Sequence, residues 1–224
     1  MLPLPDLDPS TTAVLAIDMH RGHLDPDVAT MPVTPELATR VISATEQLFD
    51  FARSRSIPIV HTILESRLIP GIGRESLINP FRQAMIASSE AQPAHFKGVK
   101  DHNVTGSVTT ESMPTLRADY EVRSKRRLGS FYGTDLEPLL RALRTETLIL
   151  AGINTNTCVQ NAAFEAFNRD FRVIMVEDCV GSMYGEDLHQ FALENVRRCL
   201  GWVVSLSDLP AMLRDQSGDE TRCP

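Results

Sequence analysis

No stretch of this sequence approaches the roughly 20 consecutive apolar residues that a membrane-spanning helix requires. The segment from Met1 to Asp6 lacks both the charged and the apolar regions of a secretory signal peptide. The four cysteines show neither a CxxC pair nor the spacing of zinc ligands. These absences predict a cytoplasmic protein with reduced thiols and no association with a membrane.

An excess of basic residues is also lacking. Lysine and arginine together number 22, against 29 aspartates and glutamates, which gives a net charge of −7. Because affinity for nucleic acid depends on a concentrated basic surface, we expect no nucleic-acid partner. The short basic run 123–127 contains Lys125 and is better explained by a functional site.

Strand-like and helix-like segments alternate along the chain. This pattern predicts an α/β fold, a three-layer Rossmann-like sandwich in which helices cover both faces of a six-stranded, mostly parallel sheet. Because 224 residues that are 42% hydrophobic can bury the core of one domain, we expect a single domain over residues 1–224 with a flexible tail at about 214–224. Thr34 and Pro35 predict the start of the first helix. The expected strands are 13–17, 57–62, 120–125, 147–153, 173–178 and 202–204, and the later helices are 138–144, 158–169 and 187–200.

The segment from about 65 to 117 interrupts this alternation. It contains one plausible helix, 75–88, followed by a polar passage that is too long for an ordinary connection. Its position after the second strand makes it a candidate pocket wall, lid or subunit contact. We expect one of its polar side chains to bind the polar end of a substrate, although each could equally be an ordinary surface residue; the candidates are Arg67, Arg74 and Lys97, with His95 and His102 nearby.

Cys158 closes a turn, 152–158, that joins an apolar strand to a predicted helix. A thiol above the first turn of a helix is favoured as the thiolate by unpaired backbone N–H groups and the helix dipole. The alternative is a small buried apolar residue, which is what most free cysteines are. Cys179 and Cys199 fit that second description better, because they fall on strand-like and helix-like apolar faces.

Two charged residues, like Cys158, lie at the ends of predicted strands. Asp18 directly follows the apolar run 13–17, and Lys125 lies at the end of the segment 120–125. In an open parallel α/β sheet, ligand chemistry gathers at the carboxyl ends of the strands. The sequence therefore predicts that Asp18, Lys125 and Cys158 lie at one site.

These three motifs, in this order, resemble the isochorismatase-like cysteine hydrolase superfamily, which includes nicotinamidases, biuret hydrolases and N-carbamoylsarcosine amidohydrolases. The resemblance covers roughly residues 12–206. It implies that Asp18, Lys125 and Cys158 form a catalytic triad. It also implies a cis peptide between Ile153 and Asn154, with the backbone N–H groups of Asn154 and Cys158 forming an oxyanion hole.

The resemblance further implies an amidohydrolase that cleaves a C–N bond of a small polar amide or N-carbamoyl compound through a thioester and releases ammonia. Cys158 would attack the carbonyl, Asp18 would carry the proton, and the Lys125 charge would stabilise the thiolate. Some members without the cysteine hydrolyse the vinyl ether of isochorismate, and this remains an alternative. A non-catalytic binding protein on the same fold is the other. We expect a homo-oligomer, a dimer or a tetramer.

The motif that begins at Asp18 departs from the pattern of the superfamily, because His20 stands where a glutamine is usual. His20, Asn154 and Tyr184 are further candidates for substrate contacts, although Asn154 or Tyr184 could simply cap a turn. His20 and His23, flanked by Asp18 and Asp25, could also form a metal site, since imidazole and carboxylate are ordinary zinc ligands. The Asp-x-His arrangement of the nicotinamidase metal site is absent after the second strand, so we expect neither metal nor cofactor. His61 is expected to be a hydrogen-bonded core residue.

Overall fold

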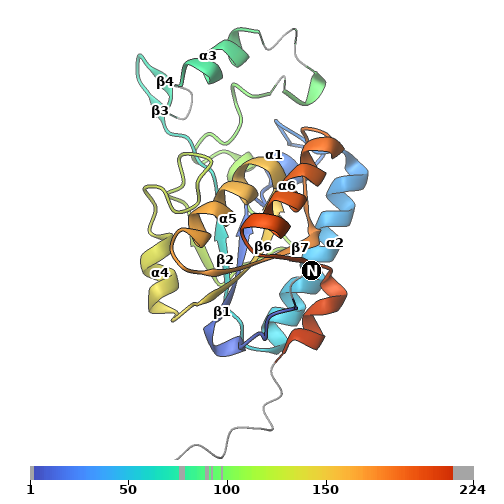
Figure 1. The fold of residues 1–224 in the computed structure, drawn as a ribbon. Coiled ribbons are helices and arrows are strands. Elements are labelled where there is room, and N and C mark those ends of the chain that lie inside the picture. The colour runs from blue at the N-terminus through green and yellow to red at the C-terminus, as the bar shows by residue number, and fades with distance from the viewer. Residues whose placement is uncertain (1–2, 76–78, 89–90, 92, 97, 214–224) are drawn as a thin grey trace, which may run out of the picture.

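A computed structural model describes residues 3–75, 79–88, 91, 93–96 and 98–213. Its centre is a six-stranded sheet in the order β5-β2-β1-β6-β7-β8, with every neighbouring pair parallel (Figure 1). This confirms the predicted α/β fold and the number of strands. The strands are β1 Thr12–Ile17, β2 Ile59–Thr62, β5 Tyr120–Val122, β6 Thr147–Ile153, β7 Arg172–Gly181 and β8 Trp202–Val204.

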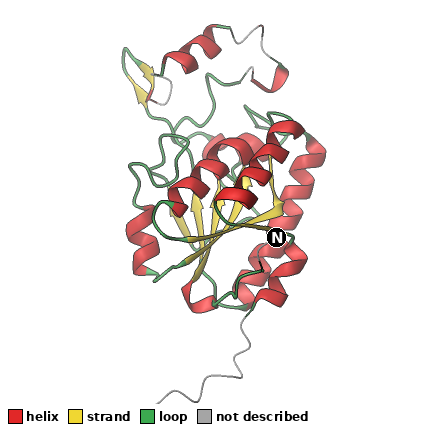
Figure 2. Cartoon of the chain, in the orientation of Figure 1, coloured by secondary structure: helices red, strands yellow, loops and turns green. Residues whose placement is uncertain are grey.

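Helices cover both faces of the sheet (Figure 2). One face packs against α2, Pro35–Ser54, and the other against α4, Leu136–Ala142, α5, Gln160–Phe167, and α6, Glu186–Cys199. Every residue of β1 is buried because alternate side chains enter the two apolar cores. The sheet is therefore the middle layer of a three-layer sandwich, as predicted.

The first long helix begins where the sequence indicates. The Thr34 hydroxyl accepts a hydrogen bond from the Leu37 N–H at 3.3 Å, and Pro35 occupies the first helical position. The buried stripe of α2 then repeats at helical spacing through Val41, Ala44 and Leu48. This stripe fixes α2 against the sheet.

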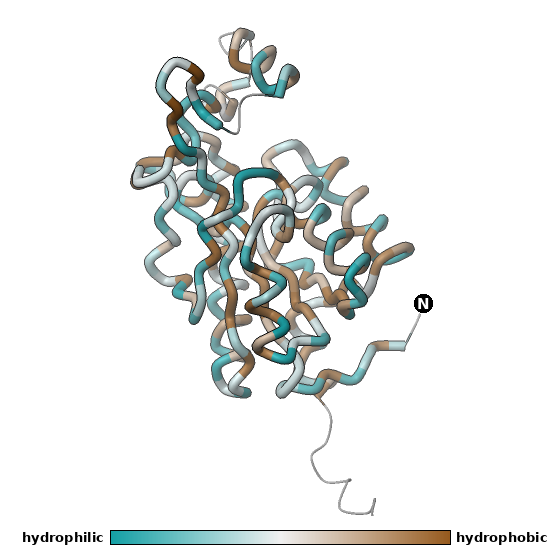
Figure 3. Tube along the Cα trace, turned by 90° about the vertical axis from the view of Figure 1, so that its left-hand side faces the viewer, coloured by the Kyte–Doolittle hydropathy of each residue, from teal (hydrophilic) through white to brown (hydrophobic). Residues whose placement is uncertain are grey.

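The predicted insertion forms an arm at the carboxyl edge of the sheet. Two short antiparallel strands, β3 Leu68–Ile69 and β4 Gly73–Arg74, lie beside α3, Pro80–Ala87, and the three stand away from the sheet (Figure 1). None of the residues of α3 is buried. In Figure 3 the tube of the arm carries hydrophobic and hydrophilic stretches side by side.

Helix α3 is shorter than the predicted span 75–88. Asn79 ends the preceding segment because its side chain accepts a hydrogen bond from the Phe81 N–H at 2.9 Å, and Pro80 then starts the helix. The predicted tail at 214–224 lies outside the described residues. In the part of the chain that is described, no helix is both long and apolar enough to cross a membrane.

Candidate active site

The registers of the central strands bring three chain segments together. Ile17 at the end of β1 pairs with Thr62 of β2 on one side and with Gly152 of β6 on the other. Asp18 follows immediately in a left-handed conformation, with φ of 54°, and its N–H donates to the Thr62 carbonyl at 2.9 Å. The end of β1 therefore turns sharply, and the Asp18 carboxylate lies between the neighbouring strands.

Gly152 is required for this close approach. A Cβ at this position would lie 2.1 Å from the Ile17 carbonyl oxygen, and φ is 137°, a value that residues with a side chain rarely adopt. Any larger residue would push β6 away from β1. Because Cys158 follows β6, this glycine sets how near the cysteine turn comes to Asp18.

The Asp18 carboxylate is fully engaged. One oxygen, Oδ1, accepts from the Leu64 N–H at 2.7 Å, and the other, Oδ2, accepts from the Lys125 ammonium at 2.5 Å. The side chains of Asp18 and Lys125 are 1% and 0% exposed, so water screens this ion pair little. Burial alone would lower the pKa of Lys125, but the opposite charge of Asp18, together with Cys158, raises it. Lys125 is therefore a cation at neutral pH.

The Cys158 thiol lies close enough to both members of this ion pair to interact with their charges. Burial and, next, the Asp18 charge raise the pKa of the thiol to about 12, and Lys125 offsets only part of that rise. The expectation of a thiolate is therefore wrong for the ligand-free protein: the thiol keeps its proton at neutral pH. Desolvation of the anion outweighs the nearby positive charge.

The turn that carries Cys158 also differs from the predicted helix 158–169. Residues Thr155–Val159 form a π-helical turn, and α5 begins only at Gln160. The Thr155 hydroxyl is hydrogen-bonded to His189 of α6 at 2.8 Å, which anchors the turn. The peptide between Ile153 and Asn154 is cis, as the resemblance implied.

A pocket of about 1010 Å³ opens above Cys158. Its wall includes many residues of the predicted insertion, which confirms that the insertion serves as a pocket wall. Its charged lining is mainly cationic: in the described residues it comprises Arg74, Arg82, Arg126 and Arg127, against the single carboxylate of Glu165. The pocket therefore favours an anionic group on a ligand.

The structure places some of the residues predicted to contact substrate in the pocket and others outside it. Arg74, Asn154 and Tyr184 line the pocket. Arg67 does not: its side chain is 64% exposed and pairs with Glu75 at 2.8 Å, so we correct that prediction. The orientation of the Arg67 side chain is set by its position at the surface and by its ion pair with Glu75.

The remaining candidates lie elsewhere. His20 is fully buried behind the pocket wall and is not part of the lining. Lys97 and the side chain of His95 fall outside the described residues. The Asn154 side chain caps a loop, because its Oδ1 accepts from the Met183 N–H at 2.9 Å.

Sequence reasoning did not identify Arg82 or Arg126 as parts of the pocket, and it gave His102 only as one of several candidates in the insertion. Arg126 adjoins Lys125, so its position next to a predicted site residue was the available signal. The other two lie in the insertion, where no strand register relates them to the sheet. Only the path of the arm brings them to Cys158.

Residues 12–208 match the isochorismatase domain. This chain belongs to the isochorismatase family. The predicted superfamily is thereby confirmed.

Two relatives of this isochorismatase-family chain have named activities. The maleamate amidohydrolase of Pseudomonas putida is 28% identical over 92% of this chain and 88% of its own length. The ureidoacrylate amidohydrolase RutB of Methylobacterium radiotolerans is 26% identical over 92% of this chain and 81% of its own. A solved cysteine hydrolase from Pseudomonas syringae pv. phaseolicola has a TM-score of 0.77, covers 94% of this chain and 97% of its own, and at 19% identity shows the shared fold.

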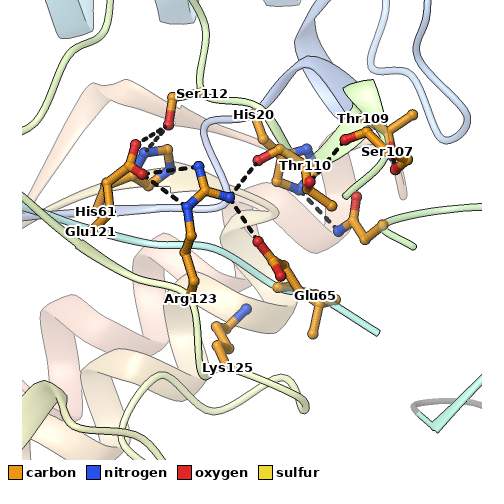
Figure 4. A network of polar contacts seen from close by, with 12 residues as sticks. His20, His61, Glu65, Ser107, Thr109, Thr110, Ser112, Glu121, Arg123 and Lys125 are labelled. Atoms are coloured by element: carbon orange, nitrogen blue, oxygen red, sulfur yellow. Dashed lines mark hydrogen bonds and ion pairs between the residues drawn. The ribbon is translucent and has the colours of Figure 1, made fainter. Parts of the chain in front are cut away.

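In this isochorismatase-family chain, a network of polar contacts joins β2, β5 and the segment before β5 close to Lys125 (Figure 4). His61 of β2 accepts a hydrogen bond from the Met19 N–H at 2.9 Å through Nε2, and its Nδ1 lies 3.0 Å from the Ser112 hydroxyl. That hydroxyl donates to Glu121 at 2.8 Å. His61 is thus the hydrogen-bonded core residue that the sequence predicted, and it holds the residue that follows Asp18.

The same network continues along β5 (Figure 4). Arg123 donates to Glu121 at 2.9 Å and to Glu65 at 2.7 Å. These bonds fix the end of β5, two residues before Lys125. Because Glu121 bonds Arg123 directly and reaches His61 through the Ser112 hydroxyl, one network positions the backbone next to both Asp18 and Lys125.

Acid is expected to destabilise the fold through His61. Burial, only partly offset by Asp18 and Glu121, lowers its pKa from 6.5 to about 4, so the unfolded chain binds a proton that the folded chain does not. Stability is therefore present above pH 6.5 and is lost as pH falls towards 4. The pKa difference of about 2.5 corresponds to about 3 kcal/mol in the free energy of unfolding.

Urea unfolding at a series of pH values between 7.5 and 4 measures this loss. In His61→Gln, which has no titrating ring, the decline should be shallower than in the unmodified protein by about that amount. The carboxylates titrate alike in both proteins, so the difference isolates His61. If the free energy of unfolding fell equally with pH in both proteins, His61 would not be the group whose protonation destabilises the fold.

Proposed function

We propose that this chain is a cysteine-dependent amidohydrolase that cleaves a C–N bond of a small amide or ureide carrying a carboxylate. The observation that carries the proposal is the Cys158 thiol, which lies beside the buried Asp18–Lys125 ion pair in a pocket lined by arginines. The names of the two relatives, both amidohydrolases, support the same reaction class.

The first half of the reaction needs a base, because a thiol with a pKa of about 12 is not ionised at neutral pH. Asp18 takes the thiol proton as the sulfur attacks the carbonyl carbon, and the Lys125 charge stabilises the sulfur while it is anionic. The backbone N–H groups of Asn154 and Cys158 donate to the developing oxyanion. Each such donor is worth about 2.7–4 kcal/mol in measured oxyanion holes.

The tetrahedral intermediate collapses when the C–N bond breaks. Asp18 returns its proton to the leaving nitrogen, ammonia departs, and the acyl group remains on Cys158 as a thioester. Water then attacks the thioester and gives its proton to Asp18, which passes it to the departing thiolate. The acid product leaves, and the protonated thiol and the ionised Asp18 are restored.

The substrate class follows from the charges of the pocket. The triad acts on the amide alone, so discrimination depends on groups that contact the rest of the substrate. Arg82 and Arg126 line the pocket together with the buried Arg74, and a carboxylate would pair with one of these guanidinium groups. A site that binds a polar group can reject the analogue lacking it by roughly 10⁴-fold.

An ammonia-release screen tests this proposal. Each carboxylated amide or ureide is compared with its uncharged ester or alkyl counterpart, and nicotinamide and isochorismate are included. We expect the carboxylated compounds to have the highest kcat/KM and their neutral partners to be poorer by up to roughly 10⁴-fold. Preference for nicotinamide would overturn the substrate class, turnover of isochorismate alone would favour ether hydrolysis, and no turnover would favour a binding protein.

Arg82→Met provides a matched variant, because it keeps an unbranched apolar stem and removes the charge. It should raise KM for the carboxylated substrate more than for the neutral one. Unchanged KM for both would assign the anion contact to another arginine. The cytoplasmic location and the homo-oligomer stay predictions.

A further inference from the structure

Three histidines gather beside the proposed catalytic site. His20 and His23 follow β1, and His102 comes from the insertion, yet one nitrogen of each ring lies within 4.8 Å of the other two. The exposed fractions of the three residues are 0%, 5% and 4%. The ring centroids are 4.6 to 5.5 Å apart. His23 and His102 line the same pocket as Cys158.

The rings of His23 and His102 are held by their Nδ1 atoms. His23 Nδ1 lies 2.7 Å from the Met31 carbonyl oxygen, which can only accept, so this nitrogen carries the proton and Nε2 has a free lone pair. His102 Nδ1 is hydrogen-bonded to the Thr30 hydroxyl at 2.8 Å. Histidines that ligate metals are oriented in this way, with one ring nitrogen bonded to a carbonyl or another polar group and the other directed to the ion.

His20 supplies an independent indication of a ligand. Its Nδ1 is buried without a hydrogen-bond partner among the described residues, and so is the Oδ1 of Asn103. The side-chain amide of Asn103 lies 3.0 Å from the Nε2 of His20; with that amide turned over, its Oδ1 accepts the Nε2 proton and the lone pair of the His20 Nδ1 is available to an ion. Buried polar groups in native proteins are nearly always satisfied by protein, water or an ion. Two unsatisfied atoms in one cluster therefore point to a bound partner.

The protonation state of the three histidines also suits metal binding. Burial is the main cause that lowers the pKa of His20, His23 and His102, so all three rings are neutral at pH 7. Only neutral imidazole offers the lone pair that a metal requires. Three adjacent cationic rings would repel one another, whereas three neutral rings can share one ion.

We propose that His20, His23 and His102 bind one divalent transition-metal ion. Imidazole ligands without thiolate or carboxylate suit Zn²⁺, Ni²⁺ or Cu²⁺ rather than Mg²⁺ or Ca²⁺. Zn–N bonds of about 2.0–2.1 Å in a tetrahedral site place two ligand nitrogens about 3.3–3.4 Å apart, so binding would bring ring nitrogens that now lie within 4.8 Å of one another closer by up to about 1.5 Å. Three histidine ligands leave one position of a four-coordinate ion for water or for a polar group of a ligand.

This proposal replaces the expectation of a metal-free protein. That expectation weighed His20 and His23 with the carboxylates of Asp18 and Asp25, each of which is paired with a cationic side chain in the structure. His102, about 80 residues away in sequence, completes a set of three nitrogen ligands, the number that zinc sites with an open position commonly use. The proposal does not depend on the amidohydrolase assignment, because metal binding is measured without substrate.

The experiment uses the full chain with Cys158→Ser, so that the nearby thiol cannot ligate the metal. Protein freed of metal by a chelator is titrated with ZnCl₂ by calorimetry and with CoCl₂ by visible absorption. We expect one equivalent of each metal, with cobalt bands typical of four-coordinate nitrogen ligation. His23→Ala and His102→Ala should each weaken binding at least 100-fold, and Thr30→Val, which only loosens His102, by 10–100-fold.

His189→Gln is the matched control, because this histidine lies outside the cluster and is bonded to Thr155. It should keep the stoichiometry and the affinity. The Thr30→Val arm keeps the proposal testable if a histidine variant fails to fold. The proposal would be overturned if the Cys158→Ser protein bound no stoichiometric metal. It would also be overturned if the His23→Ala and His102→Ala variants bound metal as tightly as that protein does.

Discussion

Cys158→Ala is expected to lower kcat for ammonia release on the order of 10³-fold or more. The thiol is the nucleophile of the proposed mechanism, and no other described cysteine lies in the pocket. Removing one sulfur from a site that touches Asp18 and Lys125 should leave the fold intact. The measurement is kcat with the best substrate of the screen, together with the circular dichroism spectrum and melting temperature.

Cys199→Ala serves as the control for Cys158→Ala. Cys199 is exposed and lies at the end of α6, far from the strand ends that carry the site. Its variant should retain the kcat of the unmodified protein. If Cys158→Ala also retained full kcat, the covalent mechanism would be wrong, whatever the reaction class.

The second large effect concerns the buried ion pair. Lys125→Met should destabilise the protein by about 3–5 kcal/mol, because it leaves the Asp18 carboxylate buried without its cation. Asp18→Asn should have a similar effect, since the Lys125 ammonium then lacks its carboxylate. Urea unfolding gives both values, and both variants should also lose turnover because each removes a proposed catalytic group.

The double variant Asp18→Asn/Lys125→Met separates stability from catalysis. With both charges gone, no unpaired charge is buried, so much of the lost stability should return. Turnover should stay absent, because neither the base nor the cation is restored. Additive destabilisation in the double variant would show that the two charges do not interact, and normal turnover in either single variant would remove that residue from the mechanism.

The elements of the sheet could be predicted because they depend on local patterns. The run 13–17 is apolar on both faces, which only an interior strand can bury, and it became β1. Thr34 and Pro35 started α2 for two reasons. The Thr34 hydroxyl accepts a hydrogen bond from a free N–H of the first turn, and Pro35 has no N–H that would need a partner. In a parallel sheet all carboxyl ends lie at one edge, and for that reason Asp18, Lys125 and Cys158 could be expected together.

Predictions that depended on the surroundings of a side chain were less successful. Arg67 was expected near a substrate, but a neighbouring carboxylate on the arm holds it at the surface. The Cys158 thiol was expected to ionise, but its burial raises the pKa. Neither the burial of a group nor its distant neighbours can be read from adjacent residues.

The sequence by itself determined the succession along the chain of the six sheet strands and their helices, the family, and which three residues meet at the edge of the sheet. The tertiary structure alone decided what surrounds them. The arm brings His102 beside His20 and His23 and adds Arg74 and Arg82 to the pocket wall. The physical reason is that hydrogen bonding and apolar periodicity act over a few residues, whereas desolvation and Coulomb interactions depend on distances that only the folded chain sets.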